Sequence, residues 1–260
     1  MTRNGKRIGG EVLGRRIDAL DWRQCLDRIF RWAARRESRY VCMCNVHSVV
    51  TARRDAGLGR VINSADLAAP DGAPVAWRLR TLGFSRQQRI NGPDLMWKCC
   101  AGAAEEGLPV FLYGSTAATL RRLREYLARE FPRLTIAGSY APPFRALTAK
   151  EDARVVKAIK DSGARVVFVG LGCPKQEVWM AEHRGRIRAV MIGVGAAFDY
   201  HAGVVQRAPP WMRDAGLEWL HRLVFEPRRL WRRYFVTNTL FLAYIASEML
   251  AGWRHRMGES

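Results

Sequence analysis

The sequence predicts an α/β fold, in which a parallel sheet with flanking helices is followed by a helical C-terminal appendage. Two observations carry this prediction. After Pro109, short apolar runs alternate with longer segments of helical periodicity, which is the order of a sheet whose parallel strands are joined by helices. From about Ala208 the alternation stops, and segments rich in arginine and tryptophan with helical spacing take its place.

The expected elements build a Rossmann-like sheet. A helix over 21–36 begins at Asp21, a residue that caps helix N-termini, and its apolar residues recur at helical spacing. Strands are expected at 12–17, 40–44, 66–69, 110–113, 134–138, 166–169 and 190–192. Further helices are expected at 75–82, 93–106, 117–130, 149–161 and about 176–184. We therefore divide the chain into an α/β core over 1–207 and a basic, aromatic-rich appendage over 208–260. Within the core, an acceptor-side part extends to about 108 and a nucleotide-binding part begins at about 109.

Composition limits the classes of partner. The 260 residues are 48% hydrophobic, which is ample for a globular core, and the formal net charge is +19. Such a charge is typical of proteins that bind nucleic acid, anionic membranes or phosphorylated substrates. The six cysteines form no C-x-x-C pair, as expected for reduced core residues of a cytoplasmic protein. The first residues lack the apolar segment of a secretory signal, and the apolar stretch 234–251 holds too many polar residues to predict a membrane span by itself.

The stretch Gly-Leu-Gly-Cys-Pro-Lys-Gln-Glu over 170–177 predicts a phosphate site. It follows a buried strand and leads into a helix, so Gly170 and Gly172 allow the backbone to approach an anion that faces the positive helix end. Lys175 and Gln176 add side-chain donors at the same place. A second strand end follows and leads to Asp199, which predicts a nucleotide-type ligand in the crevice between the two ends.

Three polar residues and another glycine follow other expected strands. Asp71 stands between Pro70 and Gly72, where it can act as a general base or simply stabilise a turn. Asn45 is either a ligand of a sugar hydroxyl or a turn residue, and His47 is either a second acid–base group or structural. Gly114 opens a strand-to-helix turn that can also cradle a phosphate.

No metal or cofactor is expected. The sequence contains no D-x-D, no H-E-x-x-H, no G-x-G-x-x-G and no P-loop motif. If a diphosphate leaves during the reaction, arginine must supply the compensating charge. Arg222, Arg229 and Arg232 are spaced seven and three apart, which places them roughly on one face of a continuous helix. The same arginines also suit a solvated face or contact with an anionic membrane.

Seven motifs occur in fixed order between about Ile8 and Arg233. They occupy residues 70–74, 89–94, 170–177, 193–199, 207–209, 216–220 and 226–229. Together they resemble the WecG/TagA/CpsF glycosyltransferase family. The resemblance covers nearly the whole chain, and the fixed order makes it far more specific than any one motif.

The resemblance implies an inverting, metal-independent transfer of a sugar from a UDP-sugar to a sugar on polyprenyl diphosphate. UDP-glucose, UDP-N-acetylmannosamine and its uronic acid are the possible donors, and the products feed bacterial cell-surface polysaccharide or exopolysaccharide. By position, Asp71 would be the base. Asn45, Arg89 and Gln176 would line the pocket, and Arg222, Arg229 and Arg232 would close over the diphosphate. The chain has Met43 where the family often has threonine.

The resemblance also implies a cytoplasmic protein that is peripheral on the inner face of the cell membrane. Two alternatives remain open at this point. One is a nucleic-acid-binding basic α/β protein, and the other is a different nucleotide-using enzyme such as a dehydrogenase. The sequence leaves open the donor sugar, the acceptor glycan, the oligomeric state (a homo-oligomer included) and whether the last helix lies on the bilayer or enters it.

Overall fold

The computed structural model describes residues 7–258, and within that range the side chains of 214, 229 and 251–258 are outside the description. Six parallel strands form the central sheet in the order β4-β3-β8-β7-β5-β6. The strands are β3 (Arg39–Cys44), β4 (Leu67–Pro70), β5 (Val110–Gly114), β6 (Ile136–Tyr140), β7 (Val166–Gly170) and β8 (Val190–Gly193). The predicted α/β class with a parallel sheet is therefore confirmed.

The N-terminal segment differs from the prediction of one strand over 12–17. It is an antiparallel hairpin of β1 (Gly9–Val12) and β2 (Arg15–Asp18). Leu13 and Gly14 both have positive φ angles, of 51° and 75°, which is the geometry of a two-residue hairpin turn and reverses the chain inside the predicted strand. The buried carboxylate of Asp18 accepts a hydrogen bond of 2.7 Å from the Ala68 amide, so it ties the hairpin to the sheet.

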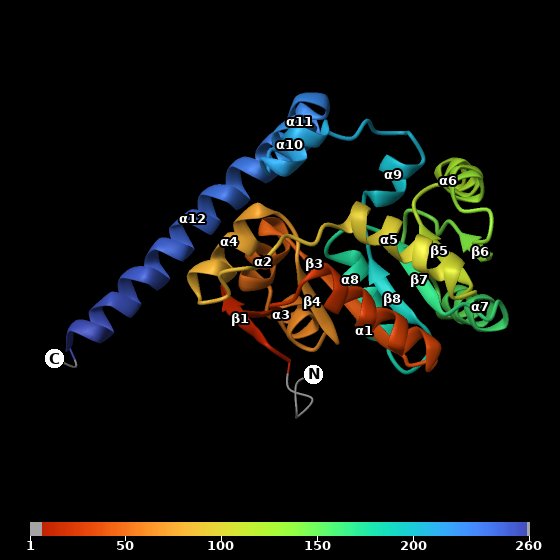
Figure 1. Ribbon diagram of the computed structural model, residues 1–260, viewed down its shortest axis with the longest axis horizontal. Coiled ribbons are helices and arrows are strands. Elements are labelled where there is room, and N and C mark those ends of the chain that lie inside the picture. The colour runs from red at the N-terminus through yellow and green to blue at the C-terminus, as the bar shows by residue number, and fades with distance from the viewer. Residues whose placement is uncertain (1–6, 259–260) are drawn as a thin grey trace.

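Helices cover both faces of the sheet (Figure 1). They are α1 (Trp22–Ala34), α2 (Val46–Arg54), α3 (Ala56–Asn63), α4 (Ala73–Thr81), α5 (Gly92–Glu105), α6 (Ala117–Glu130), α7 (Ala149–Asp161), α8 (Lys175–His183) and α9 (Ala197–His201). The predicted bounds of α6 and α7 agree with the structure, in which Thr116 and Thr148 cap the two helices. The other elements agree within about two residues.

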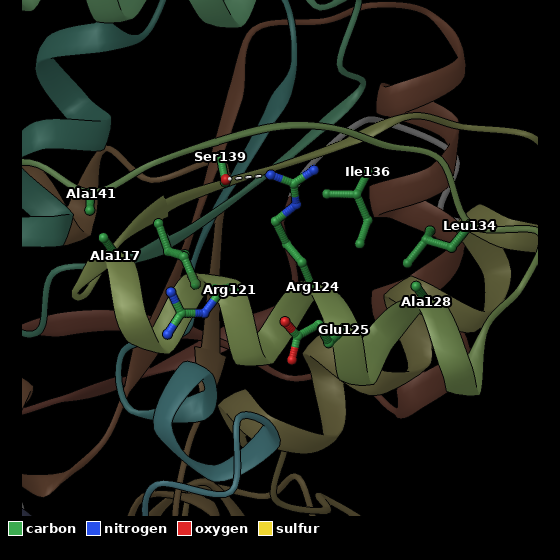
Figure 2. A pocket seen from close by; sticks show the side chains of 10 residues that line it. Ala117, Arg121, Arg124, Glu125, Ala128, Leu134, Ile136, Ser139 and Ala141 are labelled. Atoms are coloured by element: carbon green, nitrogen blue, oxygen red, sulfur yellow. Dashed lines mark hydrogen bonds between the residues drawn. The ribbon is translucent and has the colours of Figure 1, made fainter.

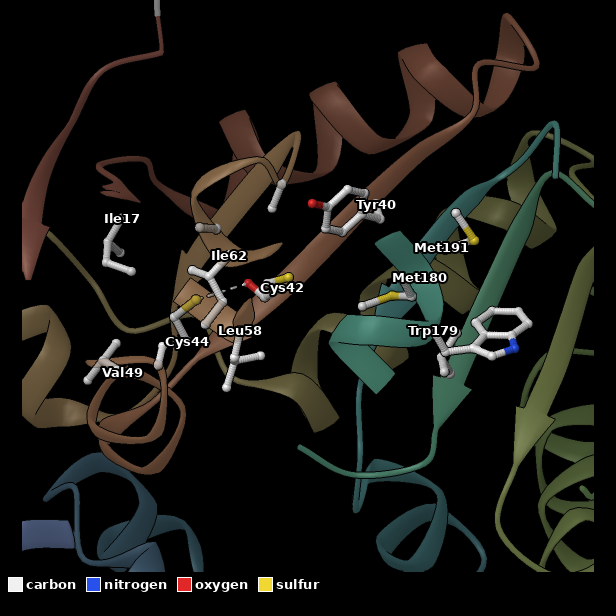
Figure 3. Packing of buried hydrophobic residues seen from close by; sticks show 14 of the residues in the cluster. Ile17, Tyr40, Cys42, Cys44, Val49, Leu58, Ile62, Trp179, Met180 and Met191 are labelled. Carbon is white, nitrogen blue, oxygen red and sulfur yellow. Dashed lines mark hydrogen bonds between the residues drawn. The ribbon is translucent and has the colours of Figure 1, made fainter. Parts of the chain in front are cut away.

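The core consists of two hydrophobic clusters, one on each face of the sheet. Side chains alternate between the faces along each strand, so Cys42 and Cys44 join one cluster while Val41 and Met43 join the other. Figure 3 shows part of the first cluster, with Tyr40 and Trp179 among its large members. Both faces are apolar because both are covered, which explains the continuous hydrophobic runs in the sequence.

Three C-terminal helices follow the sheet: α10 (Pro210–Asp214), α11 (Glu218–Phe225) and α12 (Pro227–Gly258). The turn before α11 approaches the start of α4 closely, because a Cβ built on Gly216 would stand 2.8 Å from that of Ala73. Figure 1 shows α12 as a long helix that runs beside α2 and α4. Its Glu248 accepts a hydrogen bond of 3.2 Å from Arg78 of α4 and also faces Arg53 of α2 at 3.9 Å.

Among the described residues, no helix combines the length and the apolar character that crossing a bilayer requires.

Candidate active site

The polar residues expected to carry chemistry meet at one edge of the sheet. Because all six strands are parallel, their carboxyl ends share that edge, and β4, β3, β8, β7 and β5 are consecutive neighbours along it. Asn45 follows β3, Asp71 follows β4, and Gly114 ends β5. The turn over 171–174 follows β7, and the turn over 194–196 follows β8. This edge is therefore the candidate active site.

Asp71 and Asn45 form the polar pair at the β4–β3 end of the edge. The Asp71 amide donates to the Cys44 carbonyl at 2.9 Å, which continues the pairing of β4 with β3 and fixes the carboxylate beside Asn45. The Asn45 side-chain amide donates to an Asp71 carboxylate oxygen at 3.3 Å. The Asn45 side-chain oxygen accepts from the Ser48 amide at 3.1 Å and so caps α2. Asn45 is thus both a helix cap and a partner of Asp71.

The environment of Asp71 raises the pKa of its carboxyl to about 6, from 3.8. Burial is the main cause, and the carboxylates of Glu218 and Asp94 add to it. The hydrogen bond from Asn45 and the charge of Arg89 act in the opposite direction. A carboxylate with this pKa is mostly ionised at neutral pH yet more basic than an ordinary aspartate, which suits it to accept a proton from a hydroxyl.

A network of charged residues joins the appendage to the core beside Asp71. Glu218, in the first turn of α11, faces Arg89 at 3.5 Å and Arg207 at 3.4 Å. Arg207 also pairs with Asp94 at 2.6 Å, and the Asn91 side chain donates to the other oxygen of Asp94 at 2.6 Å. Arg89 is therefore held near Asp71 by Glu218, which comes from the far end of the sequence.

The glycine turns after β5 and β7 approach each other closely. Gly114 has a φ of 125°, and a Cβ at this position would stand 2.6 Å from the backbone of Gly170. Gln176, which the family resemblance places along the pocket, is only 4% exposed, and its side chain has three hydrogen-bond partners. Its oxygen accepts from the Gly172 amide at 3.2 Å, and its nitrogen donates to the Gly193 carbonyl at 3.2 Å and to Glu177 at 2.9 Å. In this structure Gln176 links the ends of β7 and β8.

Three other residues named from the sequence also lie along this edge. Lys175, at the start of α8, is exposed. Asp199 lies half-buried in α9, and its carbonyl accepts from the Val204 amide at 2.9 Å. His47, in the first turn of α2, is half-buried, and burial together with the charge of Arg233 lowers its pKa to about 4. The imidazole of His47 is therefore neutral at pH 7.

The three appendage arginines do not share one helical face. Arg222 belongs to α11, whereas 229 and 232 belong to α12, because the chain leaves helical geometry at Glu226 before Pro227 starts the next helix. Arg222 pairs with Glu226 at 3.3 Å, and its guanidinium lies 5.8 Å from the centre of the Tyr200 ring. Arg232 is exposed. The side chain of Arg229 lies outside the described residues.

Sequence reasoning missed several residues of this edge. Glu218, Arg207 and Asp94 lie inside motifs that were noted for their order, but nothing in their spacing shows that they form one network. Glu177 is 1% exposed, and burial raises the pKa of its carboxyl, so it is a buried acid next to Gln176. The sequence gave no signal of this burial, because an acidic residue in the first turn of a helix is already explained by its favourable interaction with the positive helix end.

A cavity of about 590 Å³ lies between α6 and the outer strand β6, apart from the residues around Asp71. Figure 2 shows Arg121 and Arg124 over it, with Arg124 donating to Ser139 at 3.4 Å. None of the Asp71 network lines it. Across the described part of the chain, no group of three or more His, Cys, Asp or Glu side chains is arranged to hold a metal ion.

The sequence of residues 10–255 matches the Glycosyl transferase WecG/TagA/CpsF family. The chain belongs to this family. Its members are glycosyltransferases, so the protein is an enzyme of sugar transfer rather than a dehydrogenase. It is 33% identical over 200 residues to N-acetylglucosaminyldiphosphoundecaprenol N-acetyl-beta-D-mannosaminyltransferase of Bacillus spizizenii, a match that covers 76% of each chain. The WecG/TagA/CpsF membership confirms the family that the seven motifs predicted.

Proposed function

We propose that the protein transfers a sugar, with inversion, from a UDP-sugar to a hydroxyl of a sugar on polyprenyl diphosphate. The observation that carries this proposal is the half-buried Asp71, whose pKa is raised to about 6 at the carboxyl edge of the sheet, the edge that also holds the close-packed turns at Gly114 and Gly170. The similar mannosaminyltransferase supports both the lipid-linked acceptor and the reaction class. Among the three donors we place UDP-N-acetylmannosamine first, because that relative transfers N-acetylmannosamine.

The chemistry assigns opposite roles to the two ends of the site. Asp71 takes the proton of the acceptor hydroxyl as its oxygen attacks the anomeric carbon of the donor sugar. The bond between that carbon and the β-phosphate oxygen breaks, and its electron pair leaves with UDP. We assign the stabilisation of this negative charge to Arg222 of α11 and to the positive N-terminal end of α8, because both would lower the barrier to departure of UDP.

The donor panel and one variant test this function together. UDP release is measured with UDP-glucose, UDP-N-acetylmannosamine and its uronic acid in the presence of a synthetic lipid-diphosphate-sugar. We expect turnover with UDP-N-acetylmannosamine as the best donor. For Asp71→Asn we expect a fall of roughly 10²- to 10⁴-fold in kcat, because the amide cannot accept the proton. Equal turnover of Asp71→Asn and the wild-type protein would remove Asp71 from the role of base.

Metal independence is part of the proposal and needs its own measurement. Calorimetry of UDP binding in EDTA is expected to give the same affinity as in magnesium. Binding that appears only after magnesium or manganese is restored would refute charge compensation by arginine and backbone amides.

We also propose that the appendage rests on the cytoplasmic face of the membrane. The exposed side of α12 carries Trp231, Phe235, Leu242 and Met249, which are 57%, 69%, 65% and 51% exposed and spaced four, seven and seven apart. This spacing places them on one helical stripe, which we call the outer stripe. Exposed Arg232 borders the outer stripe, so the helix offers apolar side chains and a cation to the same surface.

Co-sedimentation with vesicles tests this surface. Phe235→Asp is expected to weaken binding to vesicles that contain anionic lipid, and neutral vesicles are expected to bind the wild-type protein less well. Unchanged sedimentation of Phe235→Asp would show that the outer stripe does not contact the bilayer.

A further inference from the structure

The buried side of α12 points two polar residues toward the active site. Leu230, Thr237, Phe241 and Ile245 are 1%, 8%, 2% and 3% exposed, and their spacing of seven, four and four places them on one face of the helix. We call this face the inner face. Because helical residues three and four apart are neighbours, Arg233 and Tyr234 lie on the inner face, between Leu230 and Thr237.

The neighbouring arginine has the opposite orientation. Consecutive residues of a helix are turned by about 100°, so Arg232 lies beyond the outer stripe residue Trp231 and away from the inner face. The accessibility agrees, since Arg232 is exposed whereas Arg233 and Tyr234 are half-buried. Two adjacent arginines therefore serve different surfaces of one helix.

The surroundings of Arg233 and Tyr234 are those of the active site. The charge of Arg233 acts on His47 after β3 and on Glu177 after β7, so its guanidinium lies near the ends of both strands. The Tyr234 ring packs edge-on against Trp219 of α11, with ring centres 5.9 Å apart. Burial raises the pKa of Tyr234, the nearby charges of Arg222 and Arg233 oppose this, and the carboxylate of Asp71 adds to it. The phenol is therefore a neutral hydrogen-bond donor in the neighbourhood of Asp71, Arg222 and Arg233.

We propose that Arg233 and Tyr234 contact the leaving diphosphate of the donor, Arg233 through its guanidinium and Tyr234 through its hydroxyl. This assignment rests on the proposed function and replaces Arg232 by Arg233 at the diphosphate. The planar guanidinium of arginine forms two parallel hydrogen bonds to phosphate oxygens, so it can compensate the charge of a diphosphate without a metal. Arg222 comes from α11, whereas Arg233 comes from α12 beside Tyr234. Both positive charges therefore reach the active site only when the appendage is packed against the core.

Matched substitutions of the two arginines test the assignment. UDP affinity is measured by calorimetry in EDTA for the wild-type protein, Arg233→Gln and Arg232→Gln. We expect Arg233→Gln to weaken UDP binding by roughly 10- to 100-fold, as loss of a charge-assisted hydrogen bond does, and Arg232→Gln to retain the wild-type affinity. Arg233→Lys, which keeps the charge and loses the fork, is expected to lie between the two, and it substitutes for Arg233→Gln if that variant does not fold.

A second pair isolates the Tyr234 hydroxyl. Tyr234→Phe keeps the ring against Trp219 and removes only the donor, and it is expected to lower kcat for the UDP-sugar by roughly 10-fold. Tyr244→Phe is the control, because Tyr244 lies on the inner face of the same helix about 15 Å further along, with its ring 4.8 Å from the Arg53 guanidinium. We expect Tyr244→Phe to retain wild-type turnover.

The outcomes separate this inference from the function on which it rests. A wild-type protein that neither binds UDP nor turns over any donor defeats the proposed function. The assignment of Arg233 is overturned if the wild-type protein binds UDP but Arg233→Gln binds it as tightly as Arg232→Gln, or more tightly. Equal kcat for Tyr234→Phe and Tyr244→Phe overturns the role of the Tyr234 hydroxyl.

Discussion

Replacement of Asn45 by serine separates the two tasks of this residue. Its side-chain oxygen caps α2 at the Ser48 amide, 3.1 Å away, and its side-chain nitrogen donates to Asp71 at 3.3 Å. A serine hydroxyl also caps a helix N-terminus, but it is too short to reach the carboxylate of the neighbouring loop. Asn45→Ser therefore keeps the helix and removes the hydrogen bond to Asp71.

The size of the effect follows from the balance that sets the Asp71 pKa. Burial raises this pKa to about 6 against the hydrogen bond from Asn45, which lowers it. A hydrogen bond to a charged group contributes about 1.5–3 kcal/mol, and a length of 3.3 Å favours the lower end of that range. About 1.4 kcal/mol corresponds to one pH unit, so the acid limb of kcat/KM is expected to move upward by roughly one pH unit. Activity at pH 6 then falls roughly fivefold, and activity at pH 8.5 is retained.

UDP release between pH 5 and pH 9 measures this limb for the wild-type protein, Asn45→Ser and Asn45→Ala. Asn45→Ala loses the cap as well, so its unfolding free energy is expected to fall by about 1 kcal/mol more than that of Asn45→Ser. If the limb of Asn45→Ser coincides with that of the wild-type protein, ionisation of Asp71 does not control the reaction through this hydrogen bond.

Three further predictions concern stability. The folded-state pKa of Asp71, about 6, exceeds its unfolded value of 3.8, so ionisation costs stability as pH rises from 3.8 to 6. The free energy of unfolding of Asp71→Asn is therefore expected to exceed that of the wild-type protein by at most about 3 kcal/mol at pH 7.5, which is measured as a higher Tm. This difference is expected to vanish near pH 4. A lower Tm of Asp71→Asn at pH 7.5 would contradict the cost of burying the ionised carboxylate. Gly114→Ala is expected to destabilise the fold by several kcal/mol and to weaken UDP binding, because its Cβ would stand 2.6 Å from the backbone of Gly170; an unchanged Tm in calorimetry would refute the close approach. Glu248→Gln loses the ion pair to Arg78 and is expected to speed limited proteolysis of α12, with at most about 1 kcal/mol lost from global stability; an identical cleavage rate would show that this pair does not hold the helix.

Most of the edge was predictable because it follows from strand order. Apolar runs located the strands, and a parallel sheet then brings Asn45, Asp71 and the 170–177 turn to one side regardless of their separation in sequence. The hairpin at β1–β2 was missed because its turn contains only one glycine, and Leu13 supplies the second positive φ from a residue type that rarely adopts it.

The appendage arginines were harder to place because their direction depends on helix phase. Spacing alone suggested one face for 222, 229 and 232, whereas the break at Glu226 and Pro227 resets the phase before the last two. The buried residues Leu230 and Thr237 fix the direction of α12, and nothing in the sequence marks Thr237 as buried and Thr239 as exposed. The side chain of Gln176 was a similar case, since its three partners come from the turns after β7 and β8 and from its own neighbour Glu177.

The position of β8 has a consequence for biosynthesis. This last strand lies between β3 and β7, so the β4–β3 pair cannot join the other strands of the sheet until residue 193 has left the ribosome. Contacts of such sequence separation are slow to form, because the entropy of closing the intervening loop is lost before the strand gains its neighbours. The nascent N-terminal half therefore exposes one long edge of β3 during synthesis, and a newly made chain is most vulnerable to mispairing in that interval.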